Sequence, residues 1–183
     1  MALTYTPDGD LGSSLPDFHL PSVDGKTFSP KDFSDSRVLV VMFMCNHCPY
    51  VQAIEDRLLD LAKRQQPKGV AFTAICANDP SEHPEDAPAA LLQRWQQKKY
   101  PFPYLVDKDQ RVAKAFGAVC TPDFFVYDQN RKLAYRGRLD DSWKNPAAVT
   151  RRELETAVTA LLSGQRPLTL QNPSMGCSIK WSK

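Results

Sequence analysis

The sequence predicts an α/β sandwich in which a central mixed sheet is flanked by helices. Residues 38–44, VLVVMFM, form an unbroken apolar run of strand length, which is typical of a strand buried on both faces. From Val51 onward apolar residues recur three and four apart, which indicates one face of a helix. A second apolar run, residues 70–76, follows that helix. Strand, helix and strand therefore form a βαβ unit at the centre of the chain.

The chain before this unit predicts a small N-terminal β-hairpin. Residues 18–20 and 26–28 flank an Asp24-Gly25 turn, and such a turn between two short apolar segments is a hairpin signal. Residues 1–16 contain Gly, Ser, Pro and Asp without periodicity. They predict an extended surface segment.

The chain after the unit predicts further elements over residues 89–99 (helix), 102–106 (strand), 110–116 (helix), 124–127 and 133–138 (strands) and 147–163 (helix). The two last strands are joined by four residues, a hairpin length, so the sheet is expected to be mixed. Residues 165–183 predict an extended C-terminal tail. Because Ile179 and Trp181 are apolar, we expect this tail to pack on one domain that comprises residues 1–183.

Charge and hydropathy exclude several classes of function. The 183 residues include 23 basic and 21 acidic side chains, a net charge of +2, which gives no electrostatic case for binding nucleic acid or a membrane surface. The longest apolar run is far too short to span a bilayer. The first residues lack the basic and apolar regions of a secretory signal, so a cytoplasmic location is expected.

A Cys-x-x-Cys pair, Cys45 and Cys48, lies where the central strand meets the helix. Residues three apart at a helix start are neighbours, so the two sulfurs can form a disulfide. The unpaired N–H groups and the helix dipole favour a thiolate, and can lower a cysteine pKa from about 8.5 to roughly 3.5–7.5. Pro49 suits the first helical position and Asn46 is the predicted N-cap. This pattern beside a βαβ unit predicts a redox motif.

Five segments carry a resemblance to a known family: PDFHLPSVDGKTF, FMCNHCPYV, GAVCTPDFFVYD, YRGRLDD and GCSIKW. With them the chain resembles a thioredoxin-fold redoxin of the peroxiredoxin-like, AhpC/TSA-type group. The CNHCPY and GCSIKW strings are similar to those of one subgroup. The resemblance covers nearly the whole chain and implies a thioredoxin-like sandwich.

The resemblance also implies roles for matching residues. Cys45 corresponds to the attacking cysteine and Cys48 to the resolving one. Pro122 corresponds to a cis-proline beside the disulfide, and Thr121 would present its backbone to a substrate chain. His47 stands where disulfide isomerases and periplasmic oxidants have histidine; a cation there stabilises the Cys45 thiolate and makes the disulfide more oxidising.

These features predict a thiol–disulfide oxidoreductase. Its substrate would be a disulfide-containing protein or a small-thiol compound, and a reducing partner would supply electrons without a cofactor. In this mechanism Cys45 is expected to be the more exposed and more acidic thiol, because it lies at the mouth of the helix. Cys48 is expected to be shielded one turn in.

A thiol peroxidase is the first alternative. The peroxiredoxin pattern is Pro-x-x-x-Thr/Ser-x-x-Cys, with a downstream arginine that holds the peroxide. Counting back from Cys48 places Cys45 and Val41 at the hydroxyl and proline positions, and counting back from Cys45 does no better. Arg136 or Arg138 could supply the arginine. The resemblance to peroxiredoxins is therefore interpreted as one of scaffold.

Two further alternatives are a metal-binding redoxin and a non-enzymatic partner-binding module. The sequence has no second Cys-x-x-Cys pair to complete a zinc site, so no metal is predicted, although His47, His83 or Cys177 could be recruited to copper or zinc. Cys120 lies two residues before Pro122, and is either simply close to the redox pair or a second functional thiol. Cys177 is a further candidate thiol.

Overall fold

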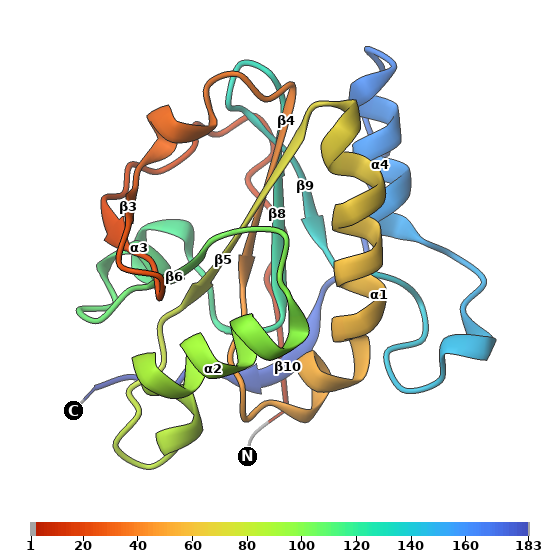
Figure 1. Ribbon diagram of the computed structural model, residues 1–183. Coiled ribbons are helices and arrows are strands. Elements are labelled where there is room, and N and C mark those ends of the chain that lie inside the picture. The colour runs from red at the N-terminus through yellow and green to blue at the C-terminus, as the bar shows by residue number, and fades with distance from the viewer. Residues whose placement is uncertain (1–2, 183) are drawn as a thin grey trace.

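The computed structural model describes residues 3–182 and has a central five-stranded sheet with the strand order β6-β5-β4-β8-β9 (Figure 1). β4 pairs in parallel with β5 and β5 with β6, whereas β8 and β9 run antiparallel, which confirms the predicted mixed sheet. The strands are β4 (Val38–Phe43), β5 (Val70–Cys76), β6 (Tyr104–Val106), β8 (Asp123–Tyr127) and β9 (Leu133–Gly137).

Helices cover the sheet, with α1 and α4 side by side against one face (Figure 1). All six β4 residues are buried, and they alternate between two cores, one beneath α1 and α4 and the other on the opposite face. None of the helices within residues 3–182 is long and apolar enough to cross a membrane. The helices are α1 (Pro49–Gln65), α2 (Pro88–Lys98), α3 (Arg111–Phe116) and α4 (Glu153–Leu162), with short 3₁₀ turns η1 (Pro30–Phe33), η2 (Gln66–Lys68), η3 (Pro84–Asp86) and η4 (Pro146–Ala148).

The N-terminal hairpin is confirmed as two short paired strands, β2 (Leu20–Pro21) and β3 (Thr27–Phe28). The last helix begins later than predicted, at Glu153 rather than residue 147. The Asp141 carboxylate accepts hydrogen bonds from the backbone N–H groups of Thr150 (2.9 Å) and Arg151 (3.0 Å). Such local side-chain bonds compete with α-helical ones, so only the short 3₁₀ turn η4 forms before Arg152 and α4 begins at Glu153.

A separate antiparallel sheet joins the two ends of the described chain. Its order is β1 (Leu3–Tyr5), β10 (Met175–Ser178) and β7 (Cys120–Thr121). The predicted extended segment therefore includes a strand, β1, which local patterns did not indicate because it forms only against a partner far along the chain. In the tail Ile179 is buried as predicted, but Trp181 is 41% exposed, with the Lys114 ammonium 5.7 Å from its ring.

Candidate active site

The Cys-x-x-Cys pair lies between the end of β4 and the start of α1. Cys48 is the N-cap residue of α1, and Pro49 takes the first turn, as predicted. The predicted N-cap, Asn46, is wrong. Its side-chain amide instead donates to the carbonyl oxygens of Glu85 (2.9 Å) and Ala90 (3.1 Å), which ties the redox loop to the segment before α2.

The two thiols contact each other and Thr121. A hydrogen bond joins the side chains of Cys45 and Cys48. The Cys45 sulfur lies 3.2 Å from Thr121 Oγ1, and the Cys48 sulfur lies 3.1 Å from the Thr121 carbonyl oxygen. The peptide bond between Thr121 and Pro122 is cis, as expected from the resemblance. The fold thus brings together residues from β7 and from the start of α1.

The acidity of the two thiols is opposite to the prediction. The hydrogen bond with Cys45 lowers the pKa of Cys48 to about 5, although burial alone would raise it. The backbone N–H groups of Val51 and Cys177 also lower this pKa. Burial, the hydrogen bond with Cys48 and the nearby Asp86 carboxylate raise the pKa of Cys45 well above its usual value. Neither thiol is exposed, at 1% for Cys45 and 0% for Cys48. Cys48 is favoured as the thiolate because Cys45 hydrogen-bonds to it, and its place at the N-cap adds the backbone N–H group of Val51.

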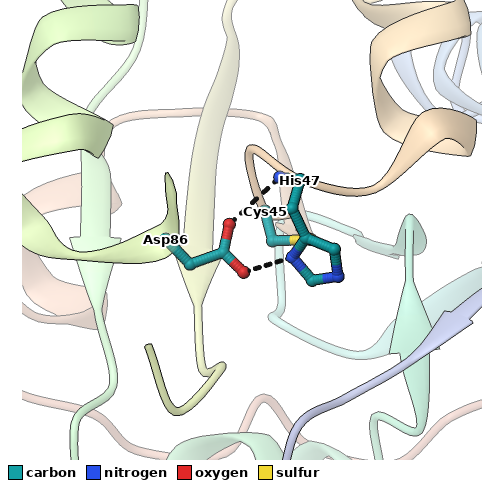
Figure 2. A group of neighbouring side chains, drawn as sticks. All are labelled: Cys45, His47 and Asp86. Carbon is teal, nitrogen blue, oxygen red and sulfur yellow. Dashed lines mark hydrogen bonds and ion pairs between the residues drawn. The ribbon is translucent and has the colours of Figure 1, made fainter. Parts of the chain in front are cut away.

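Asp86, at the end of η3, organises the redox loop and was missed by the sequence analysis. Its Oδ1 accepts the backbone N–H groups of Asn46 (2.8 Å) and His47 (3.1 Å). Its Oδ2 lies 2.5 Å from His47 Nδ1 and accepts the Asn78 amide at 2.8 Å. Figure 2 shows the carboxylate reaching the ring and the backbone of His47, with Cys45 beside them. Asp86 and Asn46 are 40 positions apart, and no local pattern links them.

The His47 ring is held by Asp86 at Nδ1 and by the ring of His83. It stacks on His83, with ring centroids 3.9 Å apart and planes 4° apart, and its Nε2 is buried without a hydrogen-bond partner among the described residues. Ligand atoms of Cys45, His47 and Asp86 lie within 4.8 Å of one another. Thiolate, imidazole and carboxylate are donors that suit zinc. However, Asp86 already accepts four hydrogen bonds, some of which a metal would displace.

Replacing Asp86 by asparagine is expected to lower the pKa of Cys45. The substitution removes a negative charge that opposes ionisation of this buried thiol, while an amide oxygen remains to accept N–H groups. The thiolate absorbance would be followed against pH in a Cys48→Ser background, where Cys45 titrates without its partner. Glu85→Gln, which removes an adjacent exposed carboxylate, is the control. An unchanged midpoint in the Asp86 variant would contradict this electrostatic role.

Both candidate peroxide-binding arginines bind carboxylates. Arg136 donates to Asp123 at 2.9 Å in a buried pair and to the Gly117 carbonyl at 2.7 Å. Arg138 donates to Glu153 at 2.6 Å. These carboxylates compete with a peroxide for both guanidinium groups, although Arg136 Nε has no hydrogen-bond partner among the described residues.

A groove of about 310 Å³ lies beside Pro122. The rings of Tyr50 and Trp143, on its wall, have centroids 4.3 Å apart. Asp140 and Arg138 add charge to the same wall. The groove reaches Pro122, which follows Thr121 in the chain, and its lining includes neither Cys45 nor Cys48. An apolar groove with a charged edge at this place suits a docked disulfide compound.

The remaining cysteines are buried, and burial raises the pKa of Cys76, Cys120 and Cys177, the last to about 12. Cys76 ends β5. Cys120 and Cys177 lie close enough to Cys48 for their charges to interact. In this structure β10 pairs with β7 at Thr121, and the role of the Thr121 backbone toward a substrate stays a prediction.

Comparison with known proteins shows where the chain belongs. The crystal structure of an uncharacterized conserved protein from Geobacillus kaustophilus aligns with a TM-score of 0.95 and 43% identity, covering 100% of this chain and 97% of that one. Thiol-disulfide oxidoreductase ResA of Bacillus thuringiensis subsp. konkukian is 24% identical over 124 residues, 68% of this chain and 67% of that protein.

A secreted disulfide oxidoreductase from Mycobacterium tuberculosis, homologous to E. coli DsbE, has a TM-score of 0.60 at 20% identity, covering 79% of this chain and 96% of that one. This likeness confirms the thioredoxin-like fold of the mixed sheet and its helices. Residues 11–136 match the AhpC/TSA family. The buried thiol pair therefore lies in a redoxin scaffold, and the chain belongs to the AhpC/TSA family.

Proposed function

We propose that this protein is a thiol–disulfide oxidoreductase that acts through the Cys45–Cys48 pair. One observation carries the proposal: two hydrogen-bonded thiols lie at the N-terminus of α1, and the pKa of Cys48 is lowered to about 5. A thiolate is the nucleophile of disulfide exchange, so the pair holds its reactive form at neutral pH. The similarity to ResA supports this chemistry.

Cys48 is the attacking thiolate in this proposal, and Cys45 is the resolving thiol. Cys48 attacks a substrate disulfide, forms a mixed disulfide and releases one substrate thiolate. Cys45 then loses its proton and attacks the Cys48 sulfur, which releases the second thiolate and leaves the Cys45–Cys48 disulfide. His47, oriented by Asp86, is the proposed acceptor of that proton, because its ring lies near the Cys45 sulfur, with ligand atoms of the two residues within 4.8 Å of each other. The assignment reverses the roles expected from the sequence, because Cys48 is the N-cap.

The substrate is a disulfide-containing protein or small disulfide that docks in the groove of Tyr50 and Trp143. A dithiol reducing partner returns the pair to its reduced state by the reverse exchange, and no cofactor takes part.

Single-turnover oxidation tests the proposal. Reduced protein mixed with one equivalent of glutathione disulfide is expected to release two equivalents of glutathione, and peptide mapping is expected to find a Cys45–Cys48 disulfide. A Cys48→Ser protein is the control for the thiols that remain. Recovery of the wild-type protein with both cysteines reduced after prolonged exposure would exclude the proposed function and favour a partner-binding module.

The rate of this oxidation is expected to rise as the pH increases through about 5 and then to level off. The thiolate replaces the thiol over that range, and only the thiolate attacks. A cysteine with an ordinary pKa would instead gain rate up to about 8.5. Initial rates of glutathione release across this range distinguish the two profiles.

A thiol peroxidase is the second candidate, since a low-pKa Cys48 followed by Pro49 at a helix start suits attack on peroxide. The carboxylate partners of Arg136 and Arg138 argue against it. Turnover of hydrogen peroxide faster than disulfide exchange would select this candidate. Stoichiometric metal in protein purified without added metal would instead select binding at Cys45, His47 and Asp86.

A further inference from the structure

Strand β10 covers the redox pair by pairing with β7. Cys177 lies opposite Thr121, and Ser178 lies opposite Cys120, in antiparallel register. The Ser174 hydroxyl donates to the Pro122 carbonyl at 2.6 Å. The chain's own residues 174–178 thus occupy the backbone edge beside both thiols.

Gly176 permits this close approach. A Cβ atom at this position would lie 1.8 Å from the Thr121 carbonyl oxygen and 2.6 Å from its carbon, both far inside van der Waals contact. These are backbone atoms and cannot rotate away. Any side chain at residue 176 would therefore move β10 off β7.

The same strand places a third thiol at the pair. Cys177 is 2% exposed, and its side chain hydrogen-bonds with Cys48. Its backbone N–H also points toward the Cys48 sulfur. Cys48 therefore has a thiol neighbour on each side, Cys45 from its own loop and Cys177 from β10.

We propose that β10 occupies the position of a substrate strand on β7, and that Cys177 is a third redox thiol, which exchanges with Cys48. This inference rests on the proposed function, since it needs a reactive Cys48. It extends that function by giving the mixed disulfide two internal routes of release.

Each exchange step balances. After Cys48 has attacked a substrate disulfide, the Cys177 thiol loses its proton to solvent and attacks the Cys48 sulfur. A Cys48–Cys177 disulfide forms and the substrate thiolate leaves. Cys45 then loses its proton and attacks Cys48, which gives the Cys45–Cys48 disulfide and the Cys177 thiolate, and Cys177 takes up a proton. The net oxidant is the substrate disulfide, and no further reagent is consumed.

Release of a coloured thiolate from dithiobisnitrobenzoate tests the inference. The parent is a Cys45→Ser, Cys120→Ser protein, which retains Cys48 and Cys177 at the site, and whose other thiol, Cys76, is buried at the end of β5 with a raised pKa. It is expected to release one equivalent by attack of Cys48 and a second as Cys177 resolves the mixed disulfide. Adding Cys177→Ser is expected to slow the second release by about tenfold or more, because an intramolecular thiol is lost.

Peptide mapping of the oxidised parent keeps the test independent of the triple variant's folding. A Cys48–Cys177 disulfide supports the inference. Release of only the first equivalent, with the aromatic thiol still on Cys48 and Cys177 reduced, overturns it and leaves the proposed function intact. If not even the first equivalent is released, Cys48 is not a reactive thiol, and the proposed function is contradicted as well.

Discussion

Replacing Cys48 by serine is expected to reduce disulfide exchange on the order of a hundredfold or more, because it removes the nucleophile. Cys45→Ser should keep the first attack, since Cys48 retains its place at the N-cap of α1. The difference would be measured as a burst of thiol release in single-turnover reactions. Rates for both variants are compared with wild type across a range of pH, because losing the Cys45 thiol, whose hydrogen bond lowers the pKa of Cys48, is expected to raise that pKa above the wild-type value of about 5.

Trapping separates the roles of the two cysteines most clearly. Cys177 is also replaced by serine, so that it cannot resolve an intermediate. A Cys45→Ser, Cys177→Ser protein should hold substrate on Cys48, whereas a Cys48→Ser, Cys177→Ser protein should hold little. The reverse pattern would make Cys45 the attacking cysteine, as the sequence predicted. Equal loss without trapping in both would point to a structural or metal-binding pair.

Gly176→Ala is expected to open the site while it weakens the fold. The new Cβ would collide with the Thr121 carbonyl, so β10 must move away from β7. We expect the free energy of unfolding to fall by about 1–3 kcal/mol, the usual range for overpacking. Alkylation of Cys48 should become faster, because the strand over it is displaced. Urea unfolding and timed alkylation with mass spectrometry measure the two effects.

Ser178→Ala is the matched control for the glycine substitution. It lies in the same strand and is half-buried, and it should leave both stability and alkylation near wild type. If Gly176→Ala protein alkylates at the wild-type rate, β10 does not limit access to the thiols. If it is too unstable to purify, Ser174→Ala removes the hydrogen bond to Pro122 and provides a milder test of the same cover.

Local patterns were enough to predict the centre of the fold. The apolar run of β4 and the helical spacing of α1 are properties of neighbouring residues, and both elements formed where expected. The position of the Cys-x-x-Cys pair, at the junction of β4 and α1, could therefore also be predicted. The hairpin at Asp24-Gly25 was also predictable, because its turn chemistry is local.

Features that depend on distant contacts could not be predicted in this way. Asp86 holds the redox loop from a segment for which the sequence predicts no helix or strand, and its role exists only once η3 packs against Asn46 and His47. The N-cap is Cys48 and not the predicted Asn46, because these contacts hold Asn46 in the loop before the helix begins. With Cys48 at the N-cap and Cys45 buried before it, the pKa of Cys48 is lowered and that of Cys45 is raised, the reverse of the prediction.

The β1-β10-β7 sheet makes the order of synthesis matter to this chemistry. Residues 45–48 leave the ribosome long before residues 175–178. Until β10 has been made and has paired with β7, a nascent chain carries its thiols without their cover. A partly synthesised or C-terminally clipped chain is therefore more open to thiol modification than the finished fold.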